Sequence, residues 1–184
     1  MRQLILPTIR LHASWLTARD EWGHGAHQPG AALWRAAGCD LDSPEGFATW
    51  VARLHQDADP SAPLPDALVH ATTWWIVDGE YLGSIQLRHT LNERLLDSGG
   101  HIGYGIRPSA RRRGHATWAL GTVLGKARSM GLFLVLITCD DDNEPSMRTI
   151  ERHGGVLEDV RDTAEGVKRR YWITVDRPGG SRGQ

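Results

Sequence analysis

Hydrophobic positions in the first third of the chain recur at helical spacing. They predict helices over about residues 11–22 and 43–58, and a short strand over 3–6 precedes them. Ser43-Pro44-Glu45 is typical of a helix start, because Ser caps the free N–H groups and Pro suits the first turn. The polar stretch 57–65 contains three prolines and is expected to form a surface loop.

After residue 69 the hydrophobic positions become continuous or alternate, as in strands. Segments 72–77 and 81–87 flank an Asp78-Gly79 turn and predict a hairpin, and a turn over 97–100 leads into a strand over 102–106. A helical stripe from 116 to 130, ending at Gly131, separates that strand from the apolar run 132–138. This strand, helix, strand order favours parallel pairing of the two strands.

The remaining pattern predicts a short helix that starts near Pro145 and ends near His153, followed by a hairpin of strands 156–160 and 167–175. Residues 178–184 are expected to form a disordered tail, and residues 1–177 a single domain. The strands and helices together indicate an α/β fold.

The most informative segment is the basic turn between the strand over 102–106 and the helix that follows it. It reads Arg111-Arg112-Arg113-Gly114-His115-Ala116. The first N–H groups of a helix lack intrahelical partners and, with the helix dipole, form an anion site. The Gly-Lys-Ser/Thr of a P-loop and the three spaced glycines of a dinucleotide fingerprint are both missing. A solvated or nucleic-acid-binding basic face is the alternative.

Composition narrows the function classes. The chain has 184 residues, 40% of them hydrophobic, and a net charge of -1, so no global field attracts nucleic acid or membranes. Cys39 and Cys139 are far apart and suggest neither a disulfide framework nor zinc, and His24 and His27 alone are not expected to bind metal. The apolar run before Pro7 is too short for a signal peptide or a membrane span, and we expect a cytoplasmic protein.

Three segments carry a family resemblance: 88–96, 100–116 and 136–155. Within them, Arg111-x-x-Gly114-x-Ala116 fits the signature of the GNAT acetyltransferases. The chain resembles a bacterial GNAT N-acetyltransferase, of a subgroup described as predicted acetyltransferases. The resemblance implies a GNAT fold, with a mixed, mostly antiparallel central sheet, a splayed parallel strand pair and flanking helices.

The resemblance also implies acetyl-CoA as cofactor and supplies its binding residues. The main chain of Ile106 and Arg107 would contact the pantetheine arm, and Asn143 would contact the cofactor or only cap the next helix. The pyrophosphate would bind at the basic turn, which consists of Arg111, Arg112, Arg113, Gly114, His115 and Ala116.

Acetyl transfer to an amine requires a base for the ammonium and an acid or a tolerant site for the thiolate. His101 is the first candidate base, with Glu93, His89 and Asp140 as alternatives. The tyrosine that serves as acid in many family members is replaced by Ile150. Tyr104 could act instead, although it is equally explained as a packed aromatic residue, or the thiolate leaves unassisted.

The acceptor is left open by the sequence. Trp15, Trp22, Trp34 and Trp50 cluster in the first third, either as core residues or, for one or two, as the wall of an acceptor pocket. A small-molecule amine is the leading acceptor, ahead of a protein lysine or N-terminus. A non-catalytic acyl-CoA-binding module is the rival function. We expect no nucleic-acid partner and leave a homodimer open.

Overall fold

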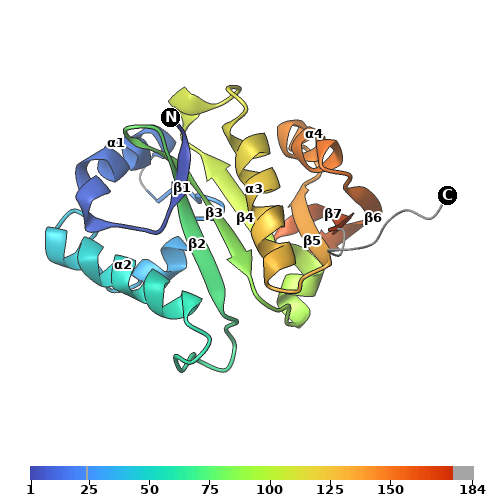
Figure 1. Ribbon diagram of the computed structural model, residues 1–184, viewed down its shortest axis with the longest axis horizontal. Coiled ribbons are helices and arrows are strands. Elements are labelled where there is room, and N and C mark those ends of the chain that lie inside the picture. The colour runs from blue at the N-terminus through green and yellow to red at the C-terminus, as the bar shows by residue number, and fades with distance from the viewer. Residues whose placement is uncertain (24, 176–184) are drawn as a thin grey trace.

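Two antiparallel sheets form the frame of the molecule (Figure 1). The computed structural model describes residues 1–23 and 25–175. The first sheet has the order β1-β2-β3-β4, with β1 Gln3–Ile5, β2 Ala71–Val77, β3 Tyr81–Arg88 and β4 Ile102–Ile106. The second has the order β5-β7-β6, with β5 Leu134–Asp140, β6 Val156–Thr163 and β7 Gly166–Thr174.

Four α-helices cover these sheets: α1 His12–Trp22, α2 Pro44–Ala58, α3 His115–Ser129 and α4 Glu144–Arg152. Figure 1 shows α1 and α2 on the side of the first sheet away from β5–β7, and α3 between the two sheets. The predicted cap of α2 is confirmed, because the Ser43 hydroxyl accepts a hydrogen bond from Gly46 N–H at 3.1 Å. The predicted helices and strands are all present, with ends shifted by a few residues.

The first sheet has an apolar core on each face, which explains the continuous hydrophobic run of β2. Trp75 and Val77 pack with Trp15, Phe47 and Trp50 beneath α1 and α2. The alternate residues Trp74 and Ile76 face the second core, which contains the inner side of α3 and residues of β5. Successive strand residues point to opposite faces, so a strand buried on both sides is apolar throughout.

The expected parallel pairing of 102–106 with 132–138 is wrong. Strands β4 and β5 meet at one point only, where His101 N–H donates to the Leu136 carbonyl at 2.7 Å and Leu136 N–H donates to His101 Nδ1 at 2.9 Å. The imidazole thus occupies the donor that a paired strand would use. Beyond this contact the two strands diverge, so the strands form two antiparallel sheets with a splayed pair between them. The predicted α/β fold with flanking helices is confirmed.

Two smaller expectations concern turns and ends. The segment that precedes β4 is a π-helical turn, Leu95–Gly99, instead of a simple turn over 97–100. Asn92 holds it by accepting a hydrogen bond from Leu95 N–H at 3.0 Å. The expected tail, residues 178–184, lies outside the described residues. No helix of the described residues is long and apolar enough to cross a bilayer.

Candidate functional site

The space between the diverging strands is a cleft of about 980 Å³. One wall is the end of β4 with the turn that opens α3, and the other is the end of β5 with the first turns of α4. The strands diverge toward the N-terminal end of α3 (Figure 1), and the residues of that helix end, where the free N–H groups lie, line the cleft.

The basic turn forms one end of this cleft. Gly114 caps α3 with φ 75°, a conformation that favours glycine, and a side chain there would meet no atom within 4 Å. Trp118 N–H is the first to bond within the helix, to the Gly114 carbonyl at 3.0 Å. The amides that precede it are therefore directed out of the helix end, where they could hold an anion.

The arginines of the turn do not act alike. Arg111 Nε donates to the Ile106 carbonyl at 3.1 Å, and its guanidinium lies 4.6 Å from the ring centre of Trp22 on α1. Arg112 lines the cleft with a left-handed backbone, φ 62°. Arg113 is exposed and, unlike its two neighbours, does not line the cleft, so only two of the three predicted side chains face the site.

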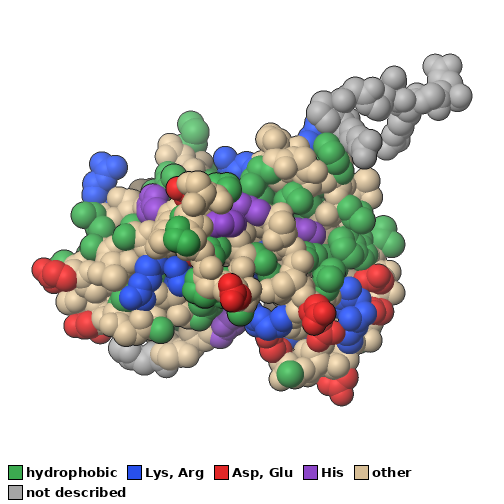
Figure 2. All heavy atoms as spheres, turned by 90° about the horizontal axis from the view of Figure 1, so that it is seen from below, with side chains coloured by type: hydrophobic (Ala, Val, Ile, Leu, Met, Phe, Trp, Pro, Cys, Tyr) green, Lys and Arg blue, Asp and Glu red, His purple; other side chains and the backbone are tan. Residues whose placement is uncertain are grey.

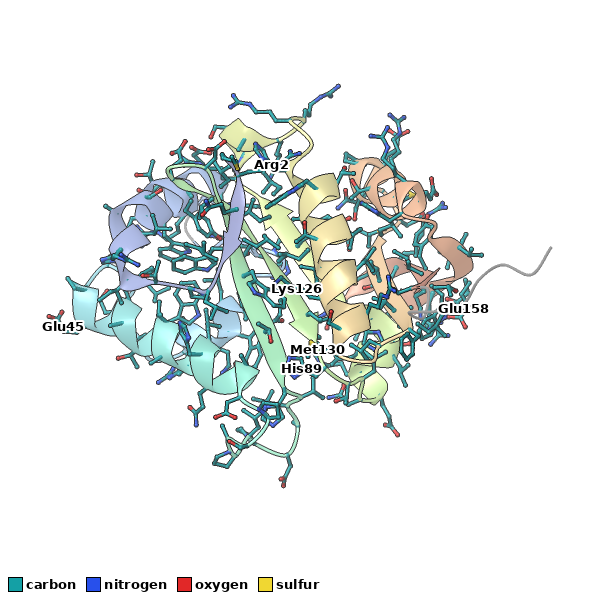
Figure 3. The ribbon with its side chains drawn as sticks, viewed as in Figure 1. Arg2, Glu45, His89, Lys126, Met130 and Glu158 are labelled. Atoms are coloured by element: carbon teal, nitrogen blue, oxygen red, sulfur yellow. The ribbon has the colours of Figure 1, made fainter. Side chains whose placement is uncertain are left out.

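Positive charge also comes from a residue that the sequence did not single out. Arg2 lies at the start of β1, near the N-terminal end of α3 (Figure 3), and its guanidinium is 5.1 Å from the ring centre of Trp118. His115, the first residue of α3, lines the cleft, and burial together with Arg2 and Arg113 lowers its pKa. The positive charges of Arg2 and Arg113 therefore lie close to the start of the helix.

The main chain of β4 has one edge bonded and one edge open. Arg107 N–H donates to the Leu82 carbonyl of β3 at 2.8 Å, and bonding alternates along an antiparallel ladder. The N–H and C=O groups of Tyr104 and Ile106 therefore face the cleft, where the Ile106 carbonyl accepts the Arg111 Nε. The N–H of Ile106 is left open to the cleft, whereas the N–H of Arg107 is already used by the sheet.

The Arg107 side chain is buried and is instead the centre of an ion-pair network. It donates to Glu21 from Nε at 3.0 Å and to Glu80 from Nη1 at 2.7 Å. Glu21 also accepts the Ser109 N–H at 3.0 Å, and bonding to Arg107 and Ser109 lowers the pKa of Glu21 to about 2. The network ties the end of α1 to the segment that precedes the basic turn.

A second, smaller cleft of about 450 Å³ meets the first. Tyr104, Asn143 and Ser146 line both clefts, as do Asp140 and the loop residues His27 and Pro29. The loop packs directly on β4, because a side chain at Gly105 would lie 2.8 Å from the Pro29 carbonyl oxygen. The glycines beside Tyr104 thus let the loop close over the strand.

The junction of the clefts is built around Tyr104. Its hydroxyl is 2.8 Å from Ser146 Oγ, and burial raises the pKa of Tyr104 to about 12. Asn143 accepts the Ser146 N–H at 3.2 Å and so caps α4, while its amide nitrogen is left to donate toward the clefts. The two roles considered for Asn143 are compatible.

His101 does not line either cleft. Its Nδ1 accepts a hydrogen bond from Leu136 N–H, so the neutral ring carries its proton on Nε2 and has no free lone pair. Burial and the charge of Arg88 lower its pKa to about 4. This geometry favours a positioning role at the point where the sheets join, over the expected role as a base.

The alternative bases are dispersed. Glu93 is exposed and lines neither cleft. His89 lies at the end of the first sheet opposite Arg2 (Figure 3) and bonds to Thr72 Oγ1 at 2.9 Å. Asp140 is at the junction, but it forms an ion pair with Lys168.

The tryptophans divide between core and cleft. Trp15 and Trp50 are fully buried in the core beneath α1 and α2. Trp22 lines the larger cleft, and Trp34, 53% exposed, lines the smaller one. Two of the four tryptophans therefore lie in the core and two line a cleft.

The described residues contain no group of three His, Cys, Asp or Glu side chains that could hold a metal ion. His24, the first of the two loop histidines, lies outside the described residues. Cys139 is a free thiol that lines the smaller cleft, and burial raises its pKa to about 11.

Sequence reasoning missed Ser146, Glu21 and Arg88, which act through partners distant in the chain. Ser146 follows Asn143 by three residues, a signal that fixed the helix cap but not the contact with Tyr104. Nothing in the local pattern pairs Glu21 with Arg107, which is 86 residues away.

Comparison with known families gives one clear match. The sequence model of the family described as acetyltransferase (GNAT) domain matches residues 31–156. None of the curated protein sequences matches the chain.

Several solved structures share the fold. RimJ from Mycobacterium smegmatis, solved with a CoA disulfide, has a TM-score of 0.68 at 19% identity, covering 94% of this chain and 81% of its own. The microcin C7 self-immunity acetyltransferase, solved with acetyl-CoA and AMP, has a TM-score of 0.66 at 14% identity, covering 95% and 92%. The Salmonella typhimurium acetyltransferase that modifies the N-terminal serine of ribosomal protein L7/L12 has a TM-score of 0.64 at 17% identity, covering 95% of both chains.

Proposed function

This chain belongs to the GNAT acetyltransferase family and is an acyltransferase that uses acetyl-CoA, and we propose that it acetylates a small-molecule amine by direct attack in a ternary complex. The observation that carries the proposal is the meeting of two clefts at Tyr104 and Ser146. The smaller cleft, at about 450 Å³, has a volume suited to a small molecule.

The larger cleft has the groups that acetyl-CoA needs. The amides at the start of α3 would hold the pyrophosphate, with Arg112 and His115 beside them. The open edge of β4 at Tyr104 and Ile106 would pair with the amides of the pantetheine arm. The Asn143 amide nitrogen would donate from the opposite wall.

Acetyl-CoA supplies the acetyl group as a reactive thioester. The N–H of Ile106 faces the cleft and can donate to a carbonyl oxygen that gains negative charge. Tyr104 keeps its proton on Oη at neutral pH because its pKa is about 12, and Ser146 Oγ orients that hydroxyl. The Tyr104 hydroxyl can therefore donate a hydrogen bond to the departing thiolate. In this role it would replace the family tyrosine, whose position is occupied by Ile150.

His27 is our candidate for the group that accepts the amine proton. It is the described imidazole that lines both clefts, whereas His101 lines neither of them. A base must lie within hydrogen-bond reach of the attacking amine, directly or through one water. Replacing His27 with Ala should reduce kcat with little change in the Kd for acetyl-CoA, and an unchanged kcat would remove this assignment.

The test of the proposed function is acetyl transfer across a panel of small amines, with peptides that offer a free N-terminus or lysine in parallel. We expect turnover with at least one class of small amine, and direct transfer predicts intersecting, not parallel, double-reciprocal plots. Faster acetylation of peptides would make this a protein acetyltransferase. Tight acetyl-CoA binding without transfer to any amine or peptide would favour the acyl-CoA-binding module.

A further inference from the structure

The smaller cleft contains a guanidinium without an ion-pair partner. Arg88, the last residue of β3, lines this cleft, and its Nη1 donates to the carbonyl oxygens of Gly99 and Gly100 at 2.7 and 3.0 Å. Among the described residues no carboxylate lies within ion-pair distance of it. Burial, with a smaller contribution from Arg94, lowers its pKa to about 10, so the group stays charged at neutral pH.

The other charged side chains of this cleft neutralise one another. Arg94 pairs with Glu165 at 2.8 Å, and Lys168 pairs with Asp140. Glu165 attracts Arg88 through space, but its carboxylate is bonded to Arg94. Figure 2 shows such acidic and basic side chains next to one another over the half that carries β5–β7. The unbalanced charge of the cleft is therefore that of Arg88.

A second group of the same cleft also lacks a partner. Gln28 is 4% exposed, and its Oε1 has no hydrogen-bond partner among the described residues. Leaving a buried polar atom unpaired is costly, so a bound molecule with a donor would be favoured beside it. Leu33 and Trp34 supply an apolar wall close to these polar groups.

We propose that the acceptor amine also carries a carboxylate, which pairs with Arg88. This proposal rests on the proposed function and names its substrate class. The two carbonyls that fix Nη1 leave Nη2 and Nε as donors, and a guanidinium fork matches a carboxylate with two parallel hydrogen bonds. The apolar wall at Trp34 would contact the rest of the molecule, so an aromatic or aliphatic amino acid has the required features.

The first experiment measures binding to the full chain in the presence of CoA, with 3-phenylpropionate and 3-phenylpropionamide as probes. The two differ in charge and share their apolar part. We expect the carboxylate to bind roughly tenfold more tightly, since hydrogen bonds to charged groups are the strong ones. A phosphonate of the same skeleton forms a third arm, and its tighter binding would identify a phosphate group in place of the carboxylate. Equal binding of carboxylate and amide, or binding of neither, would overturn the proposal.

The matched variants are Arg88→Gln and Arg128→Gln. Loss of the Arg88 charge should abolish the preference for the carboxylate, whereas Arg128→Gln, which removes an exposed cation of α3 that lines neither cleft, should retain it. Because Arg88 also donates to two carbonyl oxygens, the folding of the Arg88→Gln variant is checked by circular dichroism. If Arg88→Gln is unfolded, Arg88→Lys, which keeps the charge but not the fork, should retain only part of the preference. A full preference in a folded Arg88→Gln protein would contradict the proposal.

Turnover separates this inference from the proposed function. Phenylalanine should be acetylated with a higher kcat/KM than 2-phenylethylamine. Equal acetylation of both amines would remove the role of Arg88 and leave the acetyltransferase activity standing. Carboxylate binding without acetylation of any amine would support the role of Arg88 and contradict the proposed transfer to a small amine.

Discussion

Tyr104 shows how one side chain gains a role from its surroundings. The residue sits between two glycines that let a loop close over the strand, and its hydroxyl contacts Ser146 from another helix. Its raised pKa means that the hydroxyl keeps its proton at physiological pH and can donate a hydrogen bond.

Tyr104→Phe tests this role directly. We expect kcat to fall by roughly a hundredfold, the usual contribution of a positioned acid, with the Kd for acetyl-CoA nearly unchanged. Tyr171→Phe is the matched control, because Tyr171 is buried and its hydroxyl contacts Glu151 outside both clefts. Equal loss of activity in both variants would point to packing instead of proton donation.

Gly114, at the start of α3, is the residue that tests the proposed anion site. Gly114→Asp should abolish acetyl-CoA binding, because the new carboxylate would repel the pyrophosphate and φ 75° disfavours a side chain. Gly125→Asp is the control, since Gly125 lies on the same helix, has open space around it and is remote from the clefts. Calorimetric titration with CoA measures both, and unchanged affinity in Gly114→Asp would refute the anion site.

At the scale of elements, the end of α1 holds the segment that leads into the basic turn. Glu21 binds Arg107 and Ser109, and Trp22 stacks beneath Arg111. The end of the first helix therefore supports the proposed cofactor site, although it precedes the matched family region.

Glu21→Gln should lower the free energy of unfolding by about 2 kcal/mol and weaken acetyl-CoA binding, because the buried Arg107 loses its main ion-pair partner. Asp42→Asn is the control, since that carboxylate is 68% exposed and its pair with Arg19 contributes little. Urea unfolding and CoA titration provide the two readings. A similar small effect in both variants would contradict the network.

The same carboxylate predicts a pH dependence. The pKa of Glu21 is about 2 in the folded chain and near 4.5 when unfolded, so its contribution is complete above pH 4.5 and is lost as the pH falls toward 2. In urea unfolding at pH values from 7 down to 3, the wild type should lose more stability than Glu21→Gln. Parallel curves for the two proteins would show that Glu21 is not linked to acid unfolding.

At the scale of the whole molecule, two sheets are joined at His101 and separate toward the clefts. A ligand held by both walls would connect the two halves at their open end. Saturating acetyl-CoA at a hundred times its Kd should add about 2.7 kcal/mol of stability.

His101→Ala should destabilise the free protein by about 1–3 kcal/mol, because Leu136 N–H loses its buried acceptor. It should weaken acetyl-CoA binding, yet kcat at saturating acetyl-CoA should stay close to that of the wild type. Thermal unfolding and steady-state kinetics measure these effects. A large loss of kcat with normal stability would restore His101 as the catalytic base.

The sequence by itself determined the elements and the place of the basic turn. Hydrophobic spacing located the helices and strands, and Arg111-x-x-Gly114-x-Ala116 marked the turn that opens α3, because helix periodicity, caps and helix-end amides are local properties. Only the tertiary structure decided which side chains meet. In it, His101 bonds to β5 at the point where the two sheets join, and Ser146 contacts the Tyr104 hydroxyl. Arg88 lies in the smaller cleft without a carboxylate partner among the described residues. Such pairings join residues tens of positions apart, and they depend on how strands diverge and loops close, which no local pattern encodes.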